Sequence, residues 1–152
     1  EDYPLGPCTY DDLKIKMGQS TITAFSGAGF YTEALTTVYF KDQVTLSGAA
    51  GDWMTIPLDV PFDYDPTQSL ILEIGQCGMT GPTGFSASNT TINGLRRTWS
   101  DSGCPYAYYS TNAFVYHVGF SYGNPVVPLS NWALLIAGLL VIATIVFRLR
   151  KN

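Results

Sequence analysis

The sequence predicts an all-β fold, an antiparallel β-sandwich of the jelly-roll type, followed by one C-terminal transmembrane α-helix. About eight short segments with strand character recur roughly every 8–12 residues, separated by turn-forming residues. Before Pro128, no stretch repeats its apolar residues with the period of a helix. After it, the run from Trp132 to Phe147 contains no charged residue. These three observations separate a strand-built domain from an apolar tail.

The first predicted strand is the alternating segment DLKIKMG at residues 12–18. Its apolar side chains, Leu13, Ile15 and Met17, would face one side of a sheet, and the lysines between them the other. Such alternation is typical of a strand with one buried face. A loop with several turn signals is expected to follow at residues 19–34.

Three strands in the middle of the chain are predicted from β-branched and aromatic residues. They occupy residues 35–40, 43–48 and 51–58. Lys41 and Asp42 are predicted to join the first two strands, and Trp53 is expected to anchor the core from the third.

The second half of the domain begins with a Pro- and Asp-rich connection at 59–68, followed by SLILEIG at 69–75. That segment is almost continuously apolar, which predicts a central strand. The remaining strands are predicted at residues 84–89, 95–100 and 112–122. In the last of these, Phe114, Tyr116, Val118 and Phe120 would share one face.

The three cysteines indicate one disulfide. Cys77 and Cys104 both lie in Gly-rich loops, so we expect them to pair, closing a loop of about 27 residues worth roughly 3 kcal/mol. Such a bond persists in an oxidising compartment. Cys8 would either stay a thiol or bond to a group outside this chain. No CxxC pair or Cys/His cluster predicts a zinc site.

The charges divide the chain into an acidic domain and a basic tail. All 12 acids and five of the eight Lys and Arg residues precede the tail, so the domain carries 5 − 12 = −7 and the tail +3. An acidic domain argues against nucleic-acid binding, which requires a basic surface. It would also be repelled by an anionic membrane surface.

The apolar run of 16 residues from Trp132 to Phe147 would form a helix of about 24 Å. A bilayer core is about 30 Å thick, but an interfacial Trp132 and snorkelling Arg148, Arg150 and Lys151 can extend the span. These cations predict a cytoplasmic C-terminus and a domain outside the cytoplasm. A buried core helix is the alternative, which the absence of a polar stripe disfavours.

The domain organisation follows from this tail. We expect an extracytoplasmic domain, a linker with a sorting motif, a transmembrane helix and a basic cytoplasmic tail. Their predicted ranges are 1–124, 125–131, 132–147 and 148–152.

Two groups of residues are candidate ligand sites. An aromatic platform with an arginine could bind a glycan, through Arg97, Trp99, Tyr106, Tyr108 and Tyr109. The alternative is that Trp99 packs inward and an arginine pairs with an acid. Asp63 and Asp65 would share a face of an extended strand, which could suit calcium or a glycosidase pair. We favour a turn in which these side chains cap backbone N–H groups.

No residue is predicted to be catalytic. The single histidine, His117, is expected at the surface or rim of a strand, and no Ser nucleophile motif is present. We therefore expect no enzymatic activity, cofactor or metal.

The tail resembles the IPTL-type C-terminal sorting segments of bacterial surface proteins. The matching residues are Pro128, Leu129, Ser130 and Trp132, followed by the apolar run and then by Arg148, Arg150 and Lys151. The resemblance implies that the tail holds the protein in the inner membrane during export and that a protease can later remove it.

The domain resembles a module of secreted Bacteroidota proteins that occurs in adhesin-like chains. The residues that carry the resemblance are Leu13, Ile15, Met17, Gly18, Leu35, Thr36, Thr37, Val38, Tyr39, Trp53, Ile56, Leu58, Pro61, Phe62, Tyr64, Asp65, Leu70, Glu73 and Ile74. The acidic start EDYPLGPC is not a signal peptide, so Glu1 is expected to be a processed or truncated start. In relatives we expect further strands before this point, so the domain is expected to be incomplete by itself. A missing N-terminal piece or another chain would then fill an open sheet edge.

These observations predict a non-enzymatic protein of the cell envelope with a structural or adhesive role. Its expected partners are membrane lipid and a protein partner or copies of itself. The alternative is a glycan-binding module that uses the surface Tyr and Trp residues.

Overall fold

The computed structural model describes residues 5–49, 51–81 and 88–121. Its strands are β1 (Leu5–Ser20), β2 (Thr36–Gly48), β3 (Ser69–Gly75), β4 (Gly78–Thr80), β5 (Asn89–Thr91), β6 (Arg97–Trp99), β7 (Ser110–Asn112) and β8 (Phe114–Tyr116). Every pairing among them is antiparallel, which confirms the all-β prediction. The chain divides into two units, 1–118 and 119–152, and all eight strands lie in the first.

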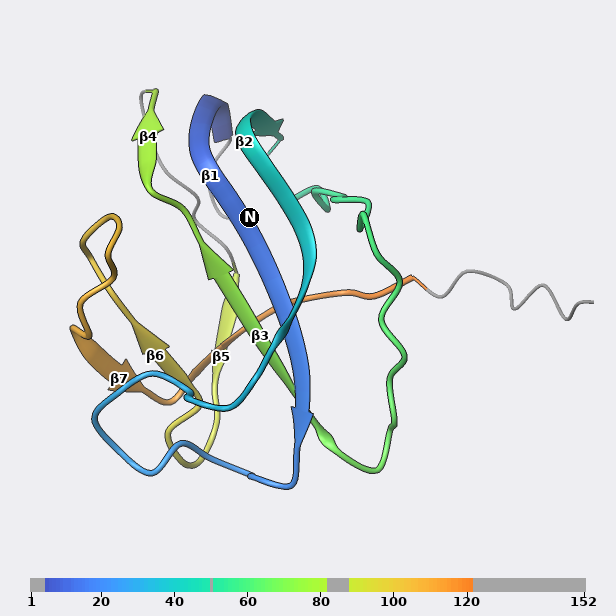
Figure 1. Ribbon diagram of the computed structural model, residues 1–152, viewed down its shortest axis with the longest axis vertical. Helices are drawn as coiled ribbons and strands as arrows, with labels where there is room; N and C mark the ends of the chain where they lie inside the picture. The colour runs from blue at the N-terminus through green and yellow to red at the C-terminus, as the bar shows by residue number, and fades with distance from the viewer. Residues whose placement is uncertain (1–4, 50, 82–87, 122–152) are drawn as a thin grey trace, which may run out of the picture. The chain divides into compact units, whose positions relative to one another are not determined.

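The main sheet is organised around β1, which Figure 1 shows with β2 on one side and with β3 and β4 on the other. Lys14–Ser20 pair with β3, and Thr9–Asp11 pair with β4. Among the described strands β3 lies at the edge of the sheet and pairs with β1 alone, so the prediction that residues 69–75 form a central strand is wrong. Its apolar run is explained by cover on both faces, since Ile71 is buried and its neighbours Leu70 and Leu72 pack against the core.

The buried positions of β1 change phase at Asp12. Cys8 and Tyr10 are buried before it, and Leu13, Ile15 and Met17 after it, all in one cluster with Val38 and Tyr39. In an uninterrupted strand, even and odd positions would face opposite sides. Asp12 has a φ of 52°, a left-handed conformation that Asp tolerates better than most residues. This kink allows both halves of β1 to contribute to one core.

β2 is one continuous strand of 13 residues, not the two strands that were predicted. Lys41 does not turn the chain, because it pairs in register with Leu13 of β1. Residues 51–58 form no strand, and Trp53 is 71% exposed, so its prediction as a core anchor is wrong. Met54 and Ile56 pack against the core instead, and alternation along an extended chain then directs Trp53 outward.

The four short strands β5 to β8 form one irregular antiparallel ribbon, in which residues 88–99 run beside residues 109–117. β5 pairs with β8, and β6 with β7. Ala113 alone separates β7 from β8, whereas residues 92–96 form the longer connection opposite it. That connection is held by Ile92 N–H donating to Ala113 O at 3.0 Å and Arg96 N–H donating to Asn112 O at 2.8 Å. The predicted strands at 95–100 and 112–122 are therefore present but shorter.

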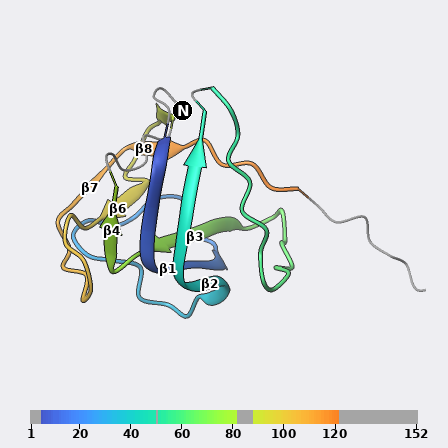
Figure 2. The same cartoon turned by 90° about the horizontal axis from the view of Figure 1, so that it is seen from above.

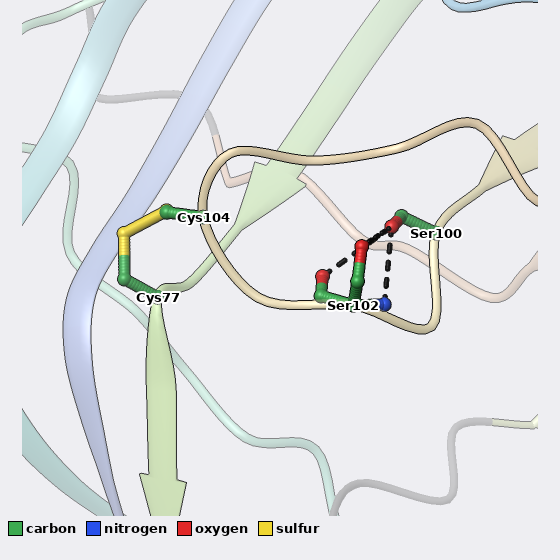
Figure 3. Close-up of a disulfide and its surroundings, with 4 residues drawn as sticks. All are labelled: Cys77, Ser100, Ser102 and Cys104. Carbon is green, nitrogen blue, oxygen red and sulfur yellow. Dashed lines mark hydrogen bonds between the residues drawn. A yellow bond between two sulfur atoms is a disulfide. The ribbon is translucent and has the colours of Figure 1, made fainter.

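The predicted disulfide between Cys77 and Cys104 is confirmed. Its Cα atoms are 4.7 Å apart, and it joins the β3–β4 junction to the loop between β6 and β7 (Figure 3). Cys8 is buried and is not part of this bond.

The predicted tail lies outside the described residues. This applies to the sorting motif at Pro128, Leu129, Ser130 and Trp132, to the helix at 132–147, and to Arg148, Arg150 and Lys151. Most of the strand predicted at 84–89 lies outside them as well. Within the described ranges, there is no helix with the length and hydropathy that a membrane span requires.

Candidate functional site

An arginine surrounded by aromatic rings lies on the β5–β8 ribbon. The guanidinium carbon of Arg97 is 5.5 Å from the ring centroid of Trp99, 5.6 Å from that of Phe114 and 5.0 Å from that of Tyr116. Tyr109 packs on Trp99, with ring centroids 4.5 Å apart and planes inclined by 52°. We call Arg97, Trp99, Tyr109, Phe114 and Tyr116 the Arg97 cluster.

Strand geometry explains why these side chains meet. Arg97 and Trp99 are two residues apart on β6, and Phe114 and Tyr116 are two apart on β8, so each pair shares a face of its strand. β7 pairs with β6, opposing Asn112 to Arg97, and continues through Ala113 into β8. The ribbon thus brings the two pairs to one place although they are far apart in the sequence.

The polar groups of the Arg97 cluster are only partly satisfied by the protein. One terminal nitrogen of Arg97, Nη1, donates to the hydroxyl of Tyr116. Arg97 Nε and Trp99 Nε1 are buried and have no hydrogen-bond partner among the described residues. In the same ranges, ion pairs join Lys16 to Glu73 and Lys41 to Asp59, and none involves Arg97.

The structure brings together three of the five residues predicted to contact a glycan: Arg97, Trp99 and Tyr109. Tyr106 lies instead against Gly75, where an added Cβ would be 2.5 Å from its hydroxyl oxygen. Burial, and secondarily the charge of Glu73, raises the pKa of Tyr106. The ring of Tyr108 packs edge-on against that of Phe30, with ring centroids 6.0 Å apart.

Two members of the Arg97 cluster, Phe114 and Tyr116, were not among the residues predicted to contact a ligand. Their alternation predicted a shared face, but only the pairing of β6 with β7 and of β5 with β8 places that face beside Arg97. No local pattern specifies such a pairing.

The acidic pair predicted at Asp63 and Asp65 lies in the connection before β3. Asp65 caps a turn: its Oδ1 accepts from Thr67 N–H at 2.9 Å and from the Thr67 hydroxyl at 2.7 Å. These bonds, and one from Gln68, lower the pKa of Asp65. The described residues contain no group of three or more His, Cys, Asp or Glu side chains that could hold a metal ion.

His117 directly follows β8. Its Nε2 is 2.7 Å from the Thr90 hydroxyl oxygen, and its backbone N–H donates to Ser88 O at 2.9 Å. These contacts tie the end of β8 to β5 across the ribbon.

The outer edge of β2 is a second candidate surface. Val38 O accepts from Asp59 N–H at 2.8 Å, and Phe40 N–H donates to Asp59 Oδ2 at 3.0 Å. Lys41 Nζ completes the contact at 2.7 Å from Asp59 Oδ1. Figures 1 and 2 both show the segment 51–68 running beyond β2. From Asp42 to Gly48, no described strand lies on this side of β2.

The contacts of Asp59 also shift its titration. The bond from Lys41, together with the backbone N–H of Phe40, holds the pKa of Asp59 below its ordinary value of 3.8. The same pair raises the pKa of Lys41. Asp59 therefore fastens the connecting segment to the covered part of the β2 edge.

Comparisons with models of protein families, with curated proteins and with solved structures gave no match to this chain.

Proposed function

We propose that this protein is a non-enzymatic cell-surface protein with a structural or adhesive role and that it acts within a larger assembly. In this proposal, its strands form a jelly-roll-like sandwich outside the cytoplasm. The segment 132–147 spans the membrane, and the basic tail, 148–152, lies in the cytoplasm.

The open part of the β2 edge is the observation that carries the assembly proposal. Val38 and Phe40 direct their backbone groups away from β1, toward Asp59 and Val60. Beyond the phase change at Asp12, the alternation of β2 is shifted by one residue, because Val44 and Leu46 pack against the core. Gln43 and Thr45 lie on the opposite face, where their side chains bond to those of Asp11 and Thr9. The backbone groups of Gln43, Thr45 and Ser47 therefore point away from β1. An unpaired row of this kind is a template for an added strand from another chain. The row lies between Asp42 and Gly48, beyond the part that Asp59 covers.

A proline placed in this row tests the proposal. Thr45→Pro removes an outward N–H, which an edge strand tolerates, while the pairing to β1 through the neighbouring residues is kept. Thr45→Ala is the matched control, because it loses the same hydroxyl and keeps the N–H. We expect wild type and Thr45→Ala to co-purify with a stoichiometric partner from native membranes, and Thr45→Pro to lose it.

Thermal unfolding of both variants would show whether each remains folded. The assembly proposal is wrong if the wild-type chain purifies alone, or if the folded proline variant retains its partner as the alanine variant does.

A second candidate function is glycan binding at the Arg97 cluster. Its outer rings are accessible: Tyr109 is 57% exposed, Tyr116 41% and Phe114 39%. Aromatic faces beside a hydrogen-bonding side chain are suited to a sugar, whose ring has apolar faces and polar edges. Retention on a polysaccharide column, lost in Tyr109→Ala and kept in Trp53→Ala, would support this function.

A further inference from the structure

We infer that the Arg97 cluster prefers an acidic sugar, a pyranose ring that carries a carboxylate. This inference rests on the second candidate function, that the cluster binds a glycan.

The first reason is the unmatched charge of Arg97. A charge withdrawn from water is unfavourable unless it is paired, and this guanidinium is half-buried with no ion pair among the described residues. The three surrounding rings compensate only in part, through cation–π attraction. A ligand carboxylate would supply the missing partner.

The second reason is hydrogen-bonding geometry. Guanidinium is a planar fork that matches the two oxygens of a carboxylate. Tyr116 accepts from Nη1 only, and no other described residue accepts from the two terminal nitrogens. These nitrogens can therefore donate to an incoming carboxylate, whereas the buried Nε cannot be reached without rearrangement.

The third reason is where the positive charge lies. Residues 1–87 contain three Lys and Arg and 11 acids, a net charge of 3 − 11 = −8. Residues 88–118 contain two arginines and one acid, a net charge of 2 − 1 = +1, with His117 neutral. Of these two parts, only the one containing the ribbon favours an anion, and within it Arg97 is the arginine ringed by aromatic side chains.

The exposed rings favour a sugar over a peptide carboxylate. The ring of Tyr116 contacts the guanidinium of Arg97 directly. The ring of Tyr109 packs on Trp99, which in turn contacts the guanidinium. Their exposed faces can stack on a flat pyranose while the guanidinium binds its carboxylate. A carboxylate at the end of a flexible side chain would leave those faces unused.

The full-length chain in detergent can be titrated by calorimetry with tetragalacturonate and with its fully methyl-esterified form. The two probes differ in charge and share the ring. We expect the acid to bind about tenfold more tightly or better, the effect of one hydrogen bond to a charged group. Raising the salt concentration should reduce this preference, because the contact is partly exposed.

Two neighbouring arginines provide a matched pair of variants. Arg97→Gln should abolish the preference for the acid, so that both probes bind equally. Arg96→Gln removes the same charge one residue away, where Arg96 Nε donates to Asn93 O at 3.0 Å, and should keep the preference. Circular dichroism of both variants checks folding. If Arg97→Gln unfolds, Arg97→Lys, which keeps the charge and loses the fork, takes its place and should weaken the preference.

The outcomes separate the two proposals. Binding of neither probe by the wild type contradicts the glycan function itself. Equal binding of both probes contradicts only the acidic-sugar inference, as does a preference that Arg97→Gln leaves intact. If a glutamate peptide binds as tightly as tetragalacturonate, the ligand is not a sugar, and the inference is overturned together with the glycan function.

Discussion

The sheet around β1 and the β5–β8 ribbon are built from the same kinds of residue but use them differently. In the sheet, Cys8 and Val38 have no exposed surface, and Ile15 and Met17 are almost fully buried. In the ribbon, all three residues of β8 are at least 38% exposed. The sheet buries a cluster of apolar residues as a core, although Phe40, Ile74 and Met79 stay exposed, whereas β8 presents all three of its residues at the surface.

The two regions are therefore held by different interactions. Burial of apolar surface stabilises the sheet, at about 25 cal/mol per Å² removed from water. The ribbon is attached by the Cys77–Cys104 disulfide and by Phe25 N–H donating to Leu95 O at 2.8 Å. Within it, the Arg97 cluster joins β6 to β8. A region fastened in this way does not need its aromatic side chains for a core, which leaves them accessible to a ligand.

The largest effect that separates the regions should come from truncating a core side chain. Ile15→Ala should lower the free energy of unfolding by about 2–5 kcal/mol, because it leaves a cavity in the buried cluster. Val115→Ala in β8 should change it by no more than about 0.5 kcal/mol, because that side chain is already exposed to water. Urea denaturation of both variants measures the contrast. Equal losses would mean that the ribbon also contributes to a core.

The sheet was easier to predict than the site, because its signals are local. The alternation of Leu13, Ile15 and Met17 identifies β1, and the Gly-rich surroundings of Cys77 and Cys104 indicated their bond. What failed depended on backbone details or on distant partners. Asp12 shifts the buried positions through one left-handed residue, a conformation that no alternation pattern specifies.

Trp53 illustrates the same limit in a single residue. A large aromatic residue in a β-type segment predicts burial, yet Met54 and Ile56 occupy the inward positions and Trp53 faces solvent. The choice between the two phases is made by contacts with β1 and β2, which are remote in sequence. For the same reason, Arg97 and Trp99 could be proposed from their own segment, whereas Phe114 and Tyr116 could not be placed beside them.

An effect within the range given for Ile15→Ala is expected from removing the disulfide. Replacing both Cys77 and Cys104 by serine should cost about 3 kcal/mol by the chain-entropy model, since the residues are 27 apart. Because the bond fastens the ribbon, amide exchange should accelerate more in β6 and β7 than in β1. Adding a reductant to wild type should reproduce this pattern and should leave the double variant unchanged. Uniform acceleration across β1 and the ribbon would show that the two regions unfold as one unit.

The smallest effect concerns Asp59, which fastens an exposed segment to the edge of the sheet by polar contacts alone. Its pKa is lowered in the folded protein from the ordinary value of 3.8, so the contact with Lys41 and Phe40 is fully present above that ordinary value. It should be lost as the pH falls through the lower folded value. The raised pKa of Lys41 sets the opposite limit, and the contact should weaken as the pH rises through that value.

Amide exchange at Phe40, corrected for the intrinsic dependence of exchange on pH, should therefore be slowest between these limits. Asp59→Asn should remove the acid limit while β1 stays protected, because the core does not depend on this carboxylate. If protection at Phe40 in the wild type does not fall at any acid pH at which β1 stays protected, the pairing with β1 and not the Asp59 contact holds this part of β2 in place.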